Sequence, residues 1–410
     1  MNSPETAYIL LWFPKPSETF VFNEVINLRE MGLPLKVFTL YGKLTRNLSP
    51  EMRSASNSVE RLGIPYLTKI HADILFWWKR DRRLVYRVLR TFFIRRWRGL
   101  EKTGENFWAF LCAFRLARRF EEEGIEHIHA PWAGGPATAA WIASCLTGIP
   151  FSFTARAWDI YPPDSVLKEK IRDATLVRSE IINNISYLSE FANGNRDKIH
   201  LTYNSLTLNV SGEASVAMRP PYRLLALGRF VEKKGYDYLI MACKILKDSG
   251  LDFGLTLAGN GPKKRQLRRL TRRLDLDDCV SFPGFITHDR IPELFRAADI
   301  FLMPSMVTSS GDRDGIPTVI MESLTYRVPV IATNVSGIPE VIENGVTGLL
   351  IPEKKPMAIA KAVLIFLGNR KGAIEMAKRG RSKVLDHFHT EKNCQKILRM
   401  YQHHFTRFGQ

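Results

Sequence analysis

The sequence predicts an α/β protein of two domains, each built on a parallel sheet covered by helices. Its 410 residues exceed what one hydrophobic core usually holds, and 45% of them are hydrophobic. Short apolar runs typical of strands alternate with segments in which apolar residues recur at helical spacing. Such alternation indicates parallel sheets whose ligands bind at the carboxyl ends of the strands.

The first half of the chain opens with a β-α-β unit. A strand is expected at 8–13, then a helix capped by Ser17 and ended near Gly32, then a strand at 35–40. Helical periodicity follows over 66–120. Later elements are expected as strands at 127–129 and 150–154 around a helix at 136–146.

The second half repeats the strand–helix rhythm more regularly. Strands are expected near 223–228, 254–259, 280–283, 300–304, 330–333 and 348–351, and helices at 235–248, 263–274, 289–298 and 317–326. Irregular polar sequence over 192–219 separates the halves. We therefore expect an N-terminal domain over 1–207, with a helix at 388–410 packing back on it, and a C-terminal domain over 208–387.

Charge and cysteine content limit the partners and the compartment. The net charge of +18 and a pI near 9.7 favour a polyanionic partner, which could be nucleic acid, an anionic membrane surface or a phosphate-rich substrate. The five scattered cysteines predict neither a zinc site nor a disulfide framework, so a reducing cytosol fits. Neither a signal peptide nor a run of about 18 to 20 apolar residues is recognisable, and any membrane contact is expected to be peripheral.

Two strand-to-helix loops of the second half carry residues suited to a phosphate ligand. Arg229 and Lys234 place two cations after the strand at 223–228, where they could offset a diphosphate charge or form a solvated basic loop. Gly259 and Gly261 allow the backbone to approach a ligand closely, although this short motif taken alone favours a tight turn without a ligand.

A third loop supplies carboxylates. Asp314 and Gly315 precede a helix expected to begin near Pro317, and Glu322 lies in its second turn. Helix-start amides receive phosphate oxygens, and the two carboxylates can accept hydrogen bonds from sugar and ribose hydroxyls. The Asp312–Asp314 pair also matches a D-x-D pattern used for divalent metals, but the loop-to-helix context favours hydroxyl and phosphate binding, so no metal site is expected.

Several motifs in order resemble one known family. They are G-R-x-V-E-K-K-G, A-G-x-G-P, F-x-G-F, a carboxylate-x7-Glu element, S-G-I-P-E-V-I and G-x-T-G-L-L-I-P, all between 228 and 352. This set resembles the donor domain of the retaining glycosyltransferase family four, in which two Rossmann-like domains face each other across a cleft in the GT-B fold. The N-terminal F-P-x-x-S-E-T-F and F-S-F-T-A stretches resemble the branch that builds bacterial exopolysaccharide, colanic-acid-like or lipopolysaccharide chains.

The resemblance implies roles for matching residues. Arg229 and Lys234 would hold the donor diphosphate, Glu322 the ribose and Asp314 the transferred sugar, which makes Asp314 the first catalytic candidate. The remaining donor-site candidates implied by the motifs are Gly259, Gly261, Gly284, Phe285, Ile286, Gly315, Ile316, Pro317 and Thr318.

Three positions depart from the family pattern. Arg156 stands where the family has a catalytic histidine, Pro131 replaces a second histidine, and Arg327 replaces a helix-closing glycine. Arg156 could hydrogen-bond a developing anion, but it cannot accept a proton near neutral pH. His129 remains a catalytic candidate, with a satisfied core histidine as the alternative.

A basic and aromatic segment over 77–98 indicates a surface function. Nine Lys and Arg residues there interleave with Trp, Phe and aliphatic residues at roughly helical spacing. This composition suits docking on an anionic bilayer, while a helix packed on the core is the alternative. Nucleic-acid binding is disfavoured because no nucleic-acid module accompanies the charge.

Together these features predict a metal-independent, retaining glycosyltransferase on the cytoplasmic face of the membrane. Its donor would be a UDP- or GDP-linked sugar, with no separate cofactor, and its acceptor a lipid-linked or growing surface polysaccharide. The alternatives are a catalytically degraded paralogue that binds nucleotide sugar or anionic membrane as a partner or scaffold, and a dinucleotide-dependent oxidoreductase, which the missing third glycine disfavours.

Overall fold

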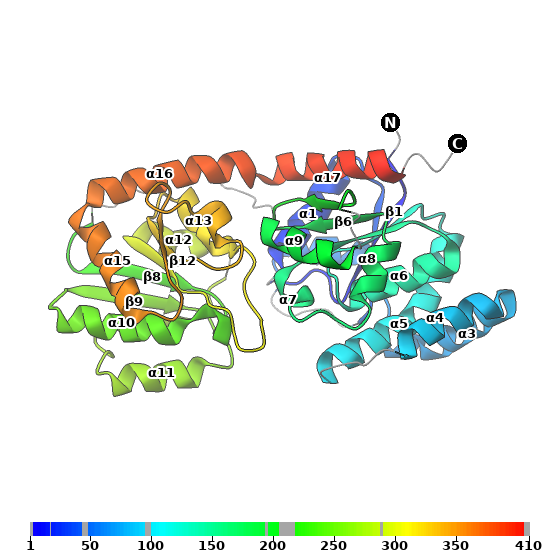
Figure 1. The fold of residues 1–410 in the computed structure, drawn as a ribbon, viewed down its shortest axis with the longest axis horizontal. Coiled ribbons are helices and arrows are strands. Elements are labelled where there is room, and N and C mark those ends of the chain that lie inside the picture. Colours follow the sequence, from blue (N-terminus) through cyan, green and yellow to red (C-terminus); the bar gives the residue numbers. More distant parts are fainter. Residues whose placement is uncertain are drawn as a thin grey trace. The chain divides into compact units, whose positions relative to one another are not determined.

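The chain forms two compact units in the computed structural model (Figure 1). The model describes residues 3–16, 18–42, 48–94, 100–192, 196–204, 218–287 and 290–405. One unit comprises 1–205 and 390–410, and the other comprises 206–389. The expected boundary at 207/208 and the proposed cap Ser17 lie outside the described residues.

The N-terminal unit is built on a parallel sheet of seven strands in the order β3-β2-β1-β4-β5-β6-β7. The strands are β1 Thr6–Leu10, β2 Leu35–Thr39, β3 Val59–Arg61, β4 His127–Ala130, β5 Phe151–Ala155, β6 Leu176–Ser179 and β7 Ile199–Leu201. The sequence analysis located β1, β2, β4 and β5 but not β3, β6 or β7.

Helices cover both faces of this sheet. One layer contains α3 Leu67–Arg80, α4 Arg82–Phe93, α5 Leu100–Glu122 and α6 Gly135–Thr147, packed over a core that includes Trp77 and Phe153. On the other face α1 Thr19–Glu30 lies beside α17 Thr390–Phe405 (Figure 1). Shorter helices complete the unit: α2 Pro50–Ala55, α7 Ala157–Ile160, α8 Leu167–Asp173 and α9 Ile182–Phe191, with 3-10 turns η1 Ser56–Ser58 and η2 Ile64–Tyr66.

The C-terminal unit has a parallel sheet of six strands in the order β10-β9-β8-β11-β12-β13. These are β8 Tyr222–Leu227, β9 Phe253–Ala258, β10 Val280–Gly284, β11 Ile300–Met303, β12 Val330–Thr333 and β13 Leu349–Ile351. All six expected strands are present. The helices are α10 Tyr236–Asp248, α11 Lys264–Arg273, α12 Ile291–Ala297, α13 Thr318–Thr325, α14 Ile338–Val341, α15 Pro356–Gly368 and α16 Arg370–His387, with η3 Glu232–Lys234 after β8.

Both units are therefore doubly wound α/β folds, as expected, and both sheets are parallel throughout. In the described part of the chain, no helix combines the length and the apolar content that a membrane crossing requires.

Candidate functional site

The carboxyl ends of the central strands of the second unit gather the expected donor-site residues. Lys234 belongs to η3 in the loop after β8, and its Nζ lies 2.9 Å from Oδ2 of Asp314. The neighbouring Lys233 is buried, with its Nζ 3.0 Å from Oδ1 of Asp312 and 3.9 Å from Oδ1 of Asp314. Each carboxylate of the D-x-D pattern thus has a lysine partner.

Asp314 is held as a carboxylate by this environment. Burial raises the pKa of Asp314. The nearby charges of Lys234 and Lys233 and a hydrogen bond from Ser305 lower it by more, so the pKa lies below its usual value. The Ser305 hydroxyl donates to Oδ2 at 2.7 Å. The Asp314 side chain is fixed by three groups and is ionised at neutral pH.

Glu322 presents an unused acceptor close to the start of α13. That helix begins at Thr318 after Pro317, and no side chain caps its first turn. The Oε2 atom of Glu322 is buried and has no hydrogen-bond partner, and burial raises the pKa of the carboxyl to about 7. A buried carboxylate without a donor is costly, so a ligand hydroxyl that supplies one would be bound favourably.

The glycines of the neighbouring loops have a structural explanation that needs no ligand. A Cβ on Gly259 would lie 1.9 Å from the carbonyl oxygen of Gly228, and one on Gly261 would lie 2.6 Å from that of Phe230. The Gly259 amide also donates to the Gly284 carbonyl at 2.8 Å. These glycines allow the loops after β8, β9 and β10 to touch backbone to backbone. The tight-turn interpretation therefore accounts for Gly259 and Gly261.

Other expected donor-site residues remain open to a ligand. Arg229 is exposed, and within the described ranges it forms no side-chain hydrogen bond or ion pair. Phe285 is 62% exposed, Gly284 has a positive φ of 92° and Ile286 is half-buried. Gly315 and Thr318 are half-buried, whereas Ile316 and Pro317 are buried beneath the loop.

Arg156 occupies a very different setting in the N-terminal unit. It follows β5 and is 4% exposed, with its guanidinium stacked on Phe20 at 4.4 Å and on Trp132 at 5.0 Å from the ring centroids. It pairs with Glu180, and its Nη1 donates to Oδ1 of Asn204 at 2.5 Å. Burial lowers its pKa to about 10, which leaves it charged. The resemblance placed this guanidinium near the substrate, but in the structure its contacts are with other protein side chains.

His129 has the environment of a satisfied core histidine. It is fully buried, its Nδ1 lies 2.7 Å from Ser152 Oγ and its Nε2 lies 3.2 Å from Thr154 Oγ1. Burial, with the positive charge of Arg178, lowers its pKa well below the usual value. Both nitrogens have protein partners, so the alternative interpretation describes this residue better than the catalytic one.

The basic aromatic segment divides into a packed face and an exposed face. Val85, Val88 and Phe92 of α4 are buried in the core, as the core-packing alternative requires. Solvent-exposed apolar residues nevertheless remain on α3 and α4, namely Leu67, Leu75, Phe76, Trp78, Tyr86, Phe93 and Ile94. Exposed cations accompany them, namely Lys69, Lys79, Arg80, Arg82, Arg83, Arg87 and Arg90. We call these two sets the basic aromatic surface; residues 95–99 lie outside the described part of the chain.

Two residues that contact the candidate donor site were missed by the sequence analysis. Lys233 and Ser305 both contact the Asp312–Asp314 loop. The lysine pair before Gly235 was a visible signal, but only one lysine was assigned a role. The left-handed helix end that a glycine would favour is kept despite the substitution, since Arg327 itself adopts a positive φ of 58°.

The second unit is similar to a known family of glycosyltransferases. Residues 214–383 match the family model "Glycosyl transferases group 1", and the two parallel-sheet units have the Rossmann-like architecture of GT-B glycosyltransferases. The Anabaena protein Alr3699/HepE, solved in complex with UDP, superposes with a TM-score of 0.72 at 15% identity, covering 97% of this chain and 100% of that one. Sucrose-phosphate synthase from Thermosynechococcus elongatus gives 0.74 at 18% identity, covering 98% and 99%.

Among curated relatives, two biosynthetic glycosyltransferases are similar. The chain is 38% identical over 172 residues to the amylovoran biosynthesis glycosyltransferase AmsK of Erwinia amylovora, an alignment that spans 42% of either chain. It is 26% identical to the putative colanic acid biosynthesis glycosyltransferase WcaL of Escherichia coli K12, over 94% of this chain and 97% of that protein.

Proposed function

We propose that the protein is a retaining, metal-independent glycosyltransferase that moves a sugar from a nucleoside-diphosphate donor to an exopolysaccharide acceptor. The observations that carry this proposal are the Lys234–Asp314 pair and the unpartnered Oε2 atom of Glu322, both in the unit that matches the glycosyl transferases group 1 model. The UDP bound by Alr3699/HepE and the polysaccharide pathways named for AmsK and WcaL support the donor and acceptor classes.

The proposed chemistry relies on charge placed around the departing diphosphate. Arg229 and Lys234 would stabilise the negative charge that develops on the leaving group, together with the uncapped amides of α13. Asp314 would accept hydrogen bonds from the sugar and Glu322 from the ribose. Retention, as the family resemblance implies, would let the leaving diphosphate oxygen take the acceptor proton, so no protein base is required.

Donor binding is the first test of this assignment. Calorimetric titration with UDP, GDP and their diphosphate-sugars should show binding of one nucleotide class, and Arg229→Ala, Lys234→Ala should weaken it by about a hundredfold or more, since each charge-assisted phosphate contact contributes about 1.5–3 kcal/mol. A control variant, Arg265→Ala, Arg272→Ala, removes two exposed charges from α11 and should bind normally. No binding of any nucleotide would overturn the proposal.

The raised pKa of Glu322 predicts a pH dependence of donor affinity. Burial sets this pKa at about 7, so the free carboxyl becomes ionised as the pH rises through 7, and an ionised carboxylate accepts ribose hydroxyls more strongly than a neutral one. Affinity for a nucleotide sugar, whose esterified diphosphate does not titrate near neutrality, should therefore rise from pH 6 to pH 8. In Glu322→Gln the profile should be flat; a wild-type profile that is also flat would contradict the ribose role.

Membrane attachment would bring the enzyme to a lipid-linked or growing acceptor at the cytoplasmic face. The basic aromatic surface supports this part of the proposal because it combines exposed aromatic and aliphatic side chains with unburied cations. Such a surface offers both apolar insertion and attraction to anionic lipids.

Vesicle binding tests the attachment. Tyr86 and Phe93 are 61% and 53% exposed, so Tyr86→Ser, Phe93→Ser should leave the fold intact and weaken partitioning onto anionic vesicles by about tenfold or more. The matched control, Met357→Ser, Ile365→Ser, removes two similarly exposed apolar groups from α15 and should partition like the parent. Equal losses in both variants, or equal binding to neutral vesicles, would refute this docking role.

One observation favours a second candidate function, that of a catalytically degraded paralogue acting as a partner or scaffold. Arg156 stands in the position of the family's histidine, and its guanidinium is engaged by Glu180 and Asn204. Tight nucleotide-sugar binding with neither transfer to membrane extracts nor slow donor hydrolysis would favour this alternative, whereas turnover would exclude it.

A further inference from the structure

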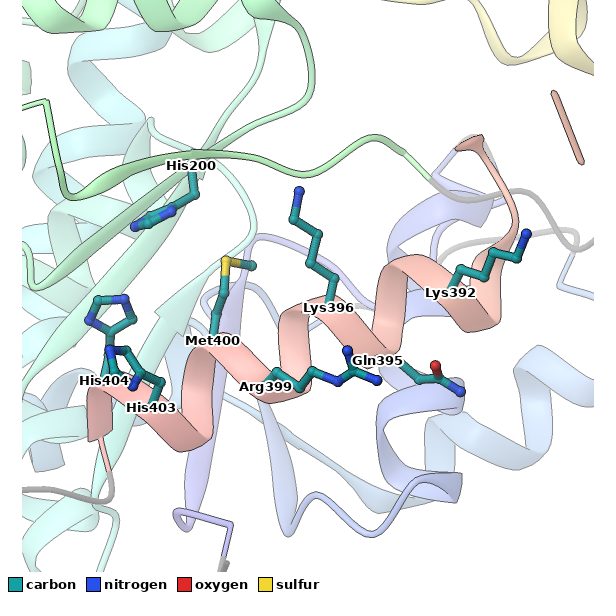
Figure 2. A pocket seen from close by; sticks show the side chains of 8 residues that line it. All are labelled: His200, Lys392, Gln395, Lys396, Arg399, Met400, His403 and His404. Carbon is teal, nitrogen blue, oxygen red and sulfur yellow. The ribbon is translucent and has the colours of Figure 1, made fainter. Parts of the chain in front are cut away.

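An open groove runs along α17 beside the edge strand β7, within the N-terminal unit (Figure 2). Its cavity of about 500 Å³ is in the range of small-molecule sites. The lining consists of His200 from β7 and, from α17, Lys392, Gln395, Lys396, Arg399, Met400, His403 and His404. The helical positions recur every three or four residues, so they form one continuous face of α17.

The charge in this groove has a single sign. Lys392, Lys396 and Arg399 follow one another at spacings of four and three residues, and no carboxylate lines the cavity. Like charges at these spacings destabilise a helix. Across the described ranges, none of the three cations forms an ion pair that would offset this repulsion, so an anion in the groove would relieve it.

Two further features distinguish the groove from a simple solvated face. The Nζ of Lys396 donates to the carbonyl oxygen of Leu201 at 2.7 Å, which fixes this ammonium group at the sheet edge. The Nε2 atom of His200 is buried and has no hydrogen-bond partner, and its ring lies 5.6 Å from that of His404. Figure 2 shows His200 and Lys396 facing the same hollow from strand and helix.

We propose that this groove binds the phosphate groups of a diphosphate-bearing ligand, at a site separate from the donor-binding residues of the second unit. The elongated row of cations suits two linked phosphates better than one. Lys396 and Arg399 would contact the phosphate oxygens, and His200 would supply a further polar contact from the sheet edge. The same chemistry is offered by a free diphosphate and by the diphosphate headgroup of a lipid, and the two sources can be separated by experiment.

Inorganic pyrophosphate, titrated calorimetrically into the full chain, is the probe. Because the donor site also attracts diphosphate, the measurement is made in the Arg229→Ala, Lys234→Ala background, where one binding event should remain. Adding Lys396→Ala, Arg399→Ala should weaken that event at least tenfold. The single variant Arg399→Glu should do the same without disturbing the Lys396 anchor. The control Arg265→Ala, Arg272→Ala removes the same charge from α11 and should have no effect.

Vesicles distinguish the source of the phosphate. Binding to vesicles of neutral lipid with and without a long-chain alkyl diphosphate, a diphosphate-headgroup probe, is compared for Arg399→Glu and its parent. Loss of pyrophosphate binding alone identifies a free diphosphate ligand, and loss of both pyrophosphate and vesicle binding identifies a lipid headgroup. Absence of the remaining pyrophosphate event, or its survival in Arg399→Glu, overturns the proposal, and neither result depends on whether the donor site is active.

Discussion

Asp314→Asn should lower kcat/KM for sugar transfer by about a hundredfold to a thousandfold while leaving the fold intact. The amide keeps the shape of the side chain but removes the charge that Lys234 and Lys233 stabilise. It also weakens the acceptor offered to the sugar in the transition state, where preorganised polar groups contribute most. Nucleoside-diphosphate affinity should not fall, because Arg229 and Lys234, the cations proposed to face the phosphates, are still present in this variant.

The neighbouring Asp312 provides a matched control for this prediction. It pairs with Lys233 at 3.0 Å and its side chain is 29% exposed, so Asp312→Asn removes one charge from the same loop without touching the Asp314 carboxylate. Steady-state kinetics of the two variants should therefore differ by at least tenfold. Equal losses would mean that the loop requires its net charge rather than the Asp314 carboxylate, and the catalytic role would have to be abandoned.

The sequence predicted the second unit more completely than the first for a physical reason. Strands of a parallel sheet that are buried on both faces appear as apolar runs, and β11 and β12 have this form. In the first unit β6 contains Arg178, a fully buried cation that pairs with Glu24 at 2.7 Å. A charge inside a strand interrupts the pattern, and its partner lies too far along the chain to be recognised locally. The edge strand β7 is simply too short.

The candidate site shows the same division between local and tertiary information. Lys234, Asp314 and Glu322 were identifiable because each lies in a motif with fixed spacing. The Ser305 hydroxyl that orients Asp314 could not be found, because its role exists only when the ends of β11 and the following loop are brought together. The spacing of Gly259 and Gly261 signalled a close approach correctly, but the approaching group is the backbone after β8.

Arg156→Ala should destabilise the N-terminal unit by about 3–5 kcal/mol, measured by urea denaturation. Removing the guanidinium leaves the Glu180 carboxylate, 8% exposed, without its ion-pair partner, and breaking a buried pair on one side is strongly destabilising. The rings of Phe20 and Trp132 lose their shared cation at the same time. Replacing both members, Arg156→Ala with Glu180→Ala, should recover more than half of the loss because no uncompensated charge then remains.

The same geometry decides what Arg156→His should do. An imidazole is too short to keep the contacts with both Glu180 and Asn204, so the variant should lose stability and should not gain transfer activity. A large gain would instead show that the arginine is a lesion in a decayed active site. If neither Arg156→Ala nor Arg156→His changed the urea midpoint, the buried guanidinium would not be holding the unit together. It would then be available to a substrate, as the family resemblance first suggested.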